Sequence, residues 1–320
     1  MTYWTTREAA QAWGVSERRV QKLLSEGRVS GAVRQGRRWA IPAGAERPSD
    51  QRSYRNLDIA PQFRERFAAI DALKAELTRR RPLSSDELER IRREFTVEYT
   101  YDSNAIEGST LTLRETALIL DGLTIGEKPL KEHLEAIGHR DAYEFVETLA
   151  ARVPPEPITS RIIRDIHFLV LADRPDSRGD FRHVPVRILG TAHRPPEPIR
   201  VPELIDELLE GLASSRHHPI EKAAQFHLRF ESIHPFIDGN GPTGRLLHNL
   251  KLLQSSYLPI NIKYTDRRRY YDCFLAWDET HDPQPMIELV NDYVEQRLRE
   301  WVNLGSLAIV NKPVSSPAAA

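Results

Sequence analysis

Apolar residues at helical spacing recur from about residue 60 to residue 303, and this pattern restricts the chain to a mainly α fold. Side chains three and four positions apart lie on one face of a helix, so each run can bury one stripe against its neighbours. A chain of 320 residues is long enough for one large domain and a smaller one. The pattern predicts helices at 63–80, 86–107, 114–122, 132–152, 159–172, 202–214, 219–232, 243–254, 267–280 and 285–303.

Three segments depart from the helical pattern. Residues 184–200 alternate and contain several prolines, which favours a β-hairpin beside the helices. Residues 46–60 have the composition of a linker, and the Ser, Pro and Ala residues at the end of the chain predict a disordered tail. We therefore divide the chain into a head at 1–45, the linker at 46–60, an N-terminal helical part at 61–125, a helical body at 126–303 and the tail at 304–320.

Composition limits the cellular setting. Cys273 is the single cysteine, which excludes an intrachain disulfide and fits a reducing compartment. No run approaches the ~20 apolar residues of a membrane span, and the N-terminus has no apolar core of a secretory signal. The sequence therefore predicts a cytoplasmic protein without a membrane partner.

The segment 234–245, H-P-F-I-D-G-N-G-P-T-G-R, carries the clearest chemical signal. It lies between two helical runs, so it predicts a tight loop that leads into a helix N-terminus. Backbone N–H groups that converge there form an anion site suited to phosphates. His234 can act as a general base near neutral pH. Asp238 is an oxygen ligand of the kind Mg²⁺ uses beside nucleotides, and Arg245 can clamp a terminal phosphate.

This segment resembles the signature of the Fic family, H-x-F-x-[DE]-G-N-G-R-x-x-R, at all but one of its defined positions. The resemblance implies a Fic-type helical domain with a small β-hairpin flap that transfers AMP from ATP to a Ser, Thr or Tyr hydroxyl of a target protein. It makes His234 the catalytic base and Asp238 the Mg²⁺ ligand. It also implies phosphate binding by Gly239, Asn240, Gly241 and Arg245. The related death-on-curing kinases have a lysine at the position of Gly241, which argues against phosphorylation.

The exception is Pro242, which stands where the family has its first arginine. Proline is tolerated in the first turn of a helix, but it removes a guanidinium and one backbone N–H from the anion site. Two alternatives to an active AMP transferase therefore stay open. One is a Fic enzyme that removes AMP or transfers another nucleotide. The other is a degenerate, nucleotide-sensing Fic domain that reports to a DNA-binding head as a transcriptional regulator.

Further segments support the resemblance over about residues 60–300. R-G-D-F-R at 178–182, followed by the predicted hairpin at 184–200, resembles the Fic flap, which holds a target protein by strand addition. The segments at 132–142 and 268–275 also resemble parts of Fic domains.

The segment S-N-A-I-E-G at 103–108 resembles the inhibitory motif [ST]-x-x-x-E-[GN] of Fic proteins. Ser103 and Glu107 are four residues apart and so share one helix face. The resemblance implies that Glu107 pairs with Arg245 in the space of the ATP γ-phosphate, with Ser103 holding Glu107 in place. The alternative is an exposed glutamate at a helix end.

The head is basic, with nine Arg or Lys and four Asp or Glu in residues 1–48, although the net charge of the chain is −1. Residues 3–42 predict two helices and a hairpin around Gln35 and Gly36, and they resemble the excisionase/MerR-like winged helix-turn-helix. A homodimer would strengthen the weak DNA binding of one copy, and a basic protein-docking module is the alternative. The resemblance implies DNA contacts by Arg18, Arg19, Lys22, Arg34, Arg37 and Arg38.

Overall fold

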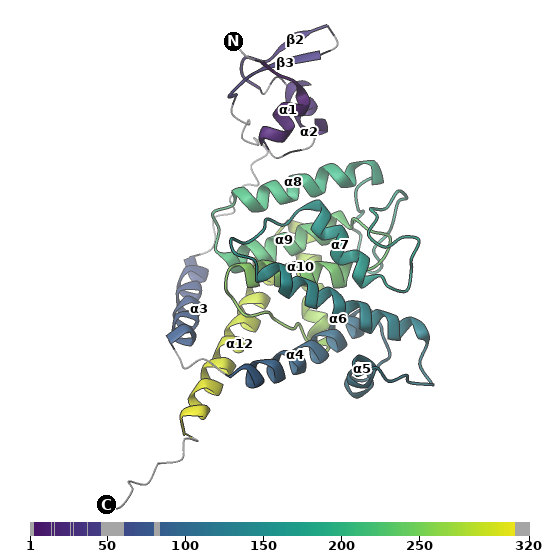
Figure 1. The fold of residues 1–320 in the computed structure, drawn as a ribbon, viewed down its shortest axis with the longest axis vertical. Helices are drawn as coiled ribbons and strands as arrows, with labels where there is room; N and C mark the ends of the chain where they lie inside the picture. Colours follow the sequence, from purple (N-terminus) through teal and green to yellow (C-terminus); the bar gives the residue numbers. More distant parts are fainter. Residues whose placement is uncertain are drawn as a thin grey trace, which may run out of the picture.

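The computed structural model describes residues 3–13, 15, 17–25, 27, 29–36, 38–45, 61–79 and 84–310. The predicted linker at 46–60, Arg37 and residues 311–320 of the predicted tail lie outside the described residues. Figure 1 shows the described part as a small head above a larger helical domain.

The head combines two short helices with a three-stranded antiparallel sheet. Its elements are β1 (Tyr3–Trp4), α1 (Thr6–Trp13), α2 (Glu17–Ser25), β2 (Val33–Gln35) and β3 (Arg38–Pro42), and the strand order is β1-β3-β2. Gln35 pairs with Arg38, and Gly36 has a φ of +60°, a left-handed conformation that glycine adopts readily. The structure therefore confirms the predicted hairpin. Ala9, Val20, Leu23 and Ile41 are among the side chains that form its core.

The large domain is helical, and each predicted helix is present. Its helices are α3 (Pro61–Arg79), α4 (Ser85–Ile106), α5 (Leu113–Leu120), α6 (Leu130–Ala150), α7 (Ser160–Val170), α8 (Val201–Ser214), α9 (Pro219–Ile233), α10 (Asn240–Gln254), α11 (Arg267–Thr280) and α12 (Gln284–Val310). Single 3₁₀ turns, η1 (Pro198–Arg200) and η2 (Tyr264–Asp266), precede α8 and α11. Ser84 with Glu87 and Thr112 with Glu115 form capping boxes that begin α4 and α5.

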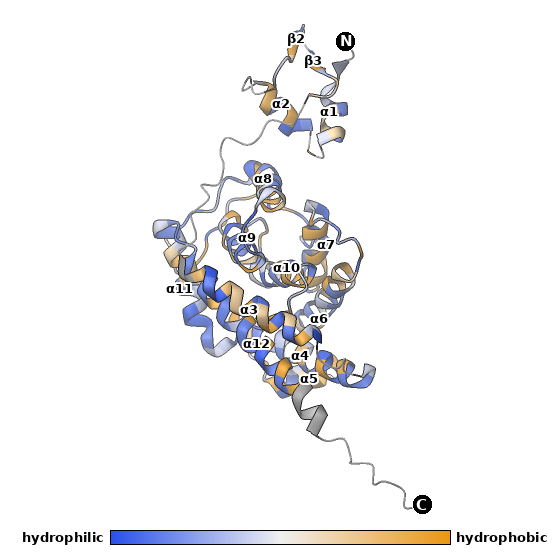
Figure 2. Ribbon diagram, turned by 90° about the vertical axis from the view of Figure 1, so that its left-hand side faces the viewer, coloured by the Kyte–Doolittle hydropathy of each residue, from blue (hydrophilic) through white to orange (hydrophobic). Residues whose placement is uncertain are grey.

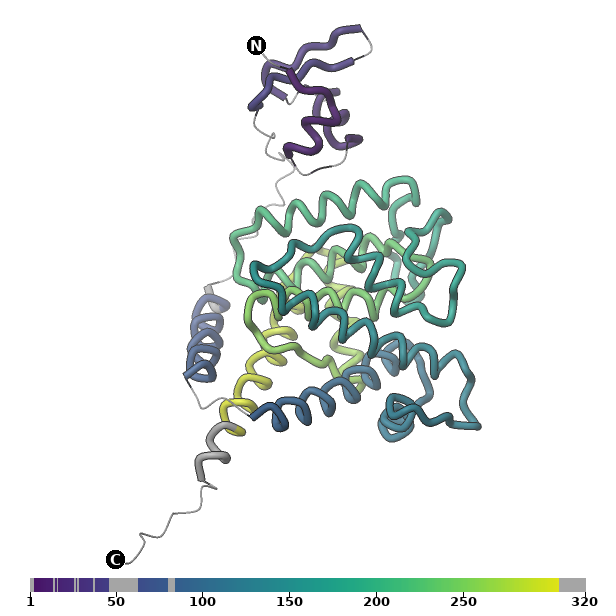
Figure 3. The backbone as a smooth tube through the Cα atoms, viewed as in Figure 1, coloured from purple at the N-terminus to yellow at the C-terminus, as the bar shows by residue number. Residues whose placement is uncertain are grey.

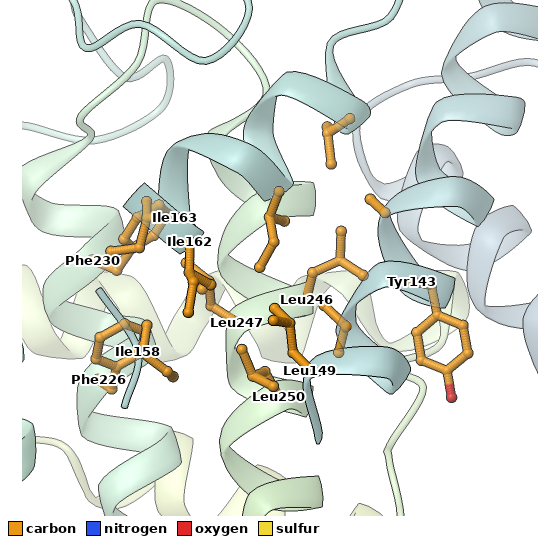
Figure 4. Packing of buried hydrophobic residues seen from close by; sticks show 14 of the residues in the cluster. Tyr143, Leu149, Ile158, Ile162, Ile163, Phe226, Phe230, Leu246, Leu247 and Leu250 are labelled. Carbon is orange, nitrogen blue, oxygen red and sulfur yellow. The ribbon is translucent and has the colours of Figure 1, made fainter. Parts of the chain in front are cut away.

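The central helix is α10, which packs against α6, α7 and α9. Figure 4 shows the core between these helices, where Ile162 and Ile163 of α7 meet Phe230 of α9 and Leu246 and Leu247 of α10. The path of the chain in Figure 3 brings α3 beside α12, although they are far apart in the sequence. Figure 2 shows hydrophobic and hydrophilic residues on the same helices, as amphipathic packing requires.

Two predictions about the edges of the domain differ from the structure. Residues 184–200 contain no strand, so the predicted β-hairpin flap is wrong for this state of the chain. Its prolines lack the N–H that ladder hydrogen bonds need, which leaves irregular backbone with a turn at Gly190 and the 3₁₀ turn η1 at its end. At the other edge, α12 continues to Val310, beyond the predicted start of the tail at 304. None of the helices within the described residues has the length and apolar character that crossing a membrane requires.

Candidate active site

The loop between α9 and α10 is closed by its own side chains. His234 ends α9 with a φ of +49°, and Gly239 begins α10 with a φ of +72°. The Asn240 Oδ1 atom accepts the Phe236 N–H at 2.9 Å, and its Nδ2 atom donates to the Phe236 carbonyl at 3.0 Å. The Asn240 side chain is therefore engaged inside the loop. Any phosphate contact at this position falls to its backbone N–H, one of the unpaired donors that begin a helix.

A second anchor of the loop is His167 of α7, which sequence reasoning missed. Its ring stacks on the buried Phe236 with centroids 3.6 Å apart and planes 3° apart. The His167 Nδ1 atom accepts the Gly179 N–H at 2.9 Å, so Nε2 carries the proton and donates to the Asp238 carbonyl at 3.0 Å. Burial lowers the pKa of His167 to about 4, which keeps the ring neutral. Its place on an apolar helix face gave no signal of this contact.

His234 is oriented as a base. Its Nδ1 atom lies 3.3 Å from the Glu231 carbonyl oxygen, which can only accept, so Nδ1 carries the proton and Nε2 has the free lone pair. Burial lowers the pKa of His234 to about 4, so the imidazole is neutral at physiological pH. Such a ring can accept a proton from a hydroxyl that is placed against it.

Arg182 joins this histidine to the segment 184–200. Its side chain is buried, and Nε donates to the His234 carbonyl at 2.8 Å while Nη2 donates to the Pro196 carbonyl at 2.5 Å. Sequence reasoning included Arg182 in a matching segment but gave it no role. Arg182 links the carbonyls of His234 and Pro196, which are distant in the sequence, so its role is visible only in the folded chain.

Asp238 lies at the mouth of the loop and is about half exposed. Its Oδ1 atom accepts the Gly239 N–H at 2.8 Å, and its Oδ2 atom is 3.0 Å from Arg174 Nη2. Within the described residues, no group of three or more His, Cys, Asp or Glu side chains could hold a metal ion. One accessible carboxylate is nevertheless what Mg²⁺ takes when substrate phosphates and water complete its coordination, so Asp238 fits this ion.

Arg245 and Glu107 form an ion pair at the far end of the loop. Arg245 is buried, and its Nη2 atom lies 2.8 Å from Glu107 Oε1. Burial opposes the charge on Arg245, but the neighbouring Tyr270 and Glu107 outweigh it and raise the pKa of the guanidinium. The predicted role of Ser103 differs, because its Oγ and carbonyl oxygen accept from Arg245 at 3.0 and 2.9 Å. Ser103 therefore holds Arg245 and does not hold Glu107. Two donors of the planar guanidinium reach Ser103.

Two glycines of α10 allow acidic side chains to approach. A Cβ atom on Gly241 would lie 2.2 Å from Glu107 Oε1, and one on Gly244 would lie 2.3 Å from Glu231 Oε1. Burial raises the pKa of Glu231 to about 8, and the charge of Glu107 adds to this effect. Burial therefore favours the neutral form of Glu231, and the carboxylate in contact with Arg245 is that of Glu107, at 2.8 Å.

Some of these side chains line a cavity of about 500 Å³. His234, Gly241, Arg245 and Glu107 lie along it, and its apolar and aromatic wall comes from α11 and from residues 188–193. The wall includes Tyr270, Tyr271, Phe274 and Leu275. A planar base fits such a wall, and phosphates fit the helix N-terminus and the buried cation.

The predicted DNA contacts of the head divide into two sets. Arg18, Arg34 and Arg38 line a groove between α2 and the hairpin, together with Lys22. Arg19 is only 6% exposed, and α8 of the large domain covers it. The prediction that Arg19 is available to DNA is therefore wrong for this arrangement, because the large domain supplies acidic partners that the sequence pattern of the head cannot reveal.

The helical fold and the loop between α9 and α10 are shared with known proteins, and comparison identifies their family. Residues 157–252 match the model of the Fic/DOC family. A relative named "Protein adenylyltransferase Fic" from Drosophila willistoni is 34% identical over 250 residues, covering 76% of this chain and 49% of its own. The chain thus spans about half the length of the curated relatives that it matches.

Solved structures agree with this assignment. A fragment of Fic-1 from C. elegans is 28% identical with a TM-score of 0.69, covering 77% of this chain and 73% of that chain. A Fic domain containing signaling protein from Bacteroides thetaiotaomicron is 25% identical with a TM-score of 0.67, covering 75% of this chain and 97% of that chain. The chain therefore carries a Fic domain of the Fic/DOC family.

Proposed function

We propose that this chain is a protein adenylyltransferase that is held inactive by Glu107. The observation that carries the proposal is the cavity that joins a neutral His234, with a free Nε2 lone pair, to Arg245 and the N-terminus of α10. The relatives that match over most of this chain bear the name protein adenylyltransferase.

In the proposed reaction, Nε2 of His234 takes the proton from a Ser, Thr or Tyr hydroxyl of the target. The hydroxyl oxygen forms a bond to the α-phosphorus of ATP, and the bond from that phosphorus to the β-bridging oxygen breaks, so pyrophosphate leaves. Backbone N–H groups at Asn240 and Gly241 would stabilise the negative charge on the phosphates, joined by that of Gly239 once Asp238 Oδ1 releases it. Asp238 would hold Mg²⁺, which neutralises part of the triphosphate charge when it is bound.

Glu107 would block this reaction through Arg245. Its carboxylate accepts a hydrogen bond from the Arg245 guanidinium, which would otherwise bind the γ-phosphate. The carboxylate and the γ-phosphate are both negative and would repel each other at this cation. Ser103 would keep Arg245 in its place in either state.

The segment 184–200 would hold the target protein. None of its residues belongs to a strand, and Leu189 is 96% exposed and Val184 is 42% exposed. A target segment that pairs with residues 184–200 would place the target's hydroxyl beside His234. Arg182 holds the two close together, because it donates to the carbonyls of His234 and Val184.

The head would bind DNA as a winged helix-turn-helix. Its two helices and its hairpin support this assignment, as does the groove lined by Arg18, Arg34 and Arg38.

Deletion of residues 1–48 should remove a salt-sensitive association with duplex DNA and leave AMP transfer intact. A homodimer would present two such heads.

The experiment that tests the proposed chemistry compares two labels on ATP. Protein modified by AMP should retain label from the α-phosphate and none from the γ-phosphate, because the β- and γ-phosphates leave together. Both reactions should be run with the Glu107→Gly chain and a lysate, followed by mass measurement of the labelled protein. Label from the γ-phosphate would mean phosphorylation, and a product that carries another nucleotide would exclude AMP transfer.

The departure from the family pattern at Pro242 supplies a further prediction. Pro242→Arg adds a cation and one N–H in the first turn of α10, where the triphosphate is proposed to lie. A charge-assisted hydrogen bond of ~1.5–3 kcal/mol should tighten ATP–Mg²⁺ binding by roughly 10- to 100-fold. Calorimetric titration of both chains measures this. Weaker binding in the variant would favour the alternative that Pro242 adapts the site to another nucleotide.

A further inference from the structure

The head and the Fic domain meet through opposite charges. Figure 1 places the head next to α8, and the contacts join the basic side of α2 to glutamates of α8. Arg19 Nη1 lies 3.3 Å from Glu207 Oε1, and Arg19 Nε lies 3.9 Å from Glu210 Oε2. Lys22 forms an ion pair with Glu203, and its Nζ atom is 3.7 Å from Glu207 Oε1.

The acidic face of α8, defined by Glu203, Glu207 and Glu210, lies on a helix that is packed against the Fic domain. These positions are four and three residues apart, so their side chains share one side of the helix. The opposite side of α8 is buried in the Fic domain through Val201, Ile205 and Leu208. The three glutamates are 13–16% exposed, so the pairs with α2 are shielded from water more than ordinary surface pairs.

The cations engaged in this contact are ones that α2 would offer to DNA. Arg19 and Lys22 lie on the helix that a winged helix-turn-helix places in the major groove. A cation that is paired with a carboxylate of α8 cannot also neutralise a phosphate. The large domain also covers this side of α2 sterically, because Arg19 is buried against it.

We propose that the acidic face of α8 substitutes for DNA phosphates, so that docking of the head on the Fic domain and binding of duplex DNA are mutually exclusive. The proposal rests on the proposed DNA binding of the head. Binding of DNA then requires release of Arg19 and Lys22 from α8. The apparent affinity of the chain for DNA is the affinity of the undocked head multiplied by the fraction of molecules that are undocked.

The test is a triple variant of the full chain, Glu203→Gln, Glu207→Gln and Glu210→Gln. Glutamine keeps the size and the helix propensity of glutamate and removes the charge, so α8 should remain folded. Each ion pair changes an equilibrium by roughly 1.5- to 5-fold. With one pair lost at each of three glutamates, the variant should bind a fluorescein-labelled duplex of mixed sequence roughly 3- to 125-fold more tightly than the wild type, measured by anisotropy at fixed salt.

A matched control separates docking from general electrostatics. Glu89→Gln, Glu94→Gln and Glu288→Gln make the same change in net charge at exposed positions of α4 and α12. This control should bind DNA like the wild type. A control that gains as much affinity as the α8 variant would overturn the proposal, because the gain would then come from net charge.

The remaining outcomes distinguish the two proposals. If the wild type and the α8 variant bind DNA equally well, the head binds DNA but α8 does not compete for it, and the inference fails alone. If neither chain binds DNA above the level of a chain that lacks residues 1–48, the proposed function of the head fails and the inference fails with it.

Discussion

The Glu107→Gly chain is expected to transfer AMP roughly 10- to 100-fold faster than the wild type. The substitution frees Arg245, which is now paired with Glu107 Oε1 at 2.8 Å, to bind the γ-phosphate of ATP. One charge-assisted hydrogen bond contributes ~1.5–3 kcal/mol, which corresponds to this range of rates or affinities. Arg245 should stay in place because Ser103 holds two of its nitrogen atoms. The measurement is incorporation of α-labelled AMP into the chain itself and into added lysate proteins.

Two companion variants isolate the charge from the backbone. Glu107→Gln removes the carboxylate without adding a glycine, and it should retain much of the activation. Glu94→Gly places a glycine in the same helix at an exposed position, where it costs ~1 kcal/mol of helix stability without touching Arg245. It should label like the wild type. Equal labelling by the wild type and Glu107→Gly would mean that Glu107 is only a residue at the end of α4.

The His234→Ala substitution should reduce AMP transfer by roughly 10²- to 10⁴-fold in the Glu107→Gly background, the usual contribution of a general base. Binding of ATP–Mg²⁺ should persist, because the backbone donors of α10 and Arg245 are unchanged. Calorimetric titration checks the binding, and the label assay checks the rate. Undiminished transfer would remove His234 from the mechanism.

His281→Ala is the matched control for this substitution. His281 also ends a helix in the left-handed conformation, with a φ of +57°, and its Nδ1 atom is hydrogen-bonded to the Trp277 carbonyl at 3.0 Å. Both substitutions therefore place alanine in a conformation that costs ~1–2 kcal/mol. If the two variants lose activity equally, the loss comes from stability and not from a missing base.

The pH dependence of the Glu107→Gly chain follows from the same histidine. His234 acts as a base only in its neutral form, and burial lowers its pKa to about 4. Because the pKa is lowered, the active form persists well below the usual range of histidine and is lost only as the pH falls through about 4. The rate should therefore show no inflection near the ordinary histidine value of ~6.5. A sharp loss of rate there would indicate an exposed base.

Local patterns in the sequence were enough to predict the helices and to indicate a phosphate-binding loop. Apolar spacing within each segment fixed the helices, because a helix face is made by residues three and four apart. The segment 234–245 indicated a phosphate site because glycines and a following helix are local features of the chain. The pairing of Glu107 with Arg245 was also predicted, and the structure has these two side chains in contact. That prediction came from the resemblance of two short motifs and not from spacing.

Contacts between side chains that are distant in the sequence became visible only in the folded chain. Ser103 binds Arg245, His167 stacks on Phe236, and Arg182 joins His234 to the segment 184–200. The contacts of Ser103 with Arg245, of His167 with Phe236 and of Arg182 with His234 each join residues more than fifty positions apart, so no local pattern records them. The docking of Arg19 on α8 is of the same kind. A basic residue on a helix face has the same sequence signature whether DNA or a carboxylate neutralises it, and only the packing of the two domains distinguishes these outcomes.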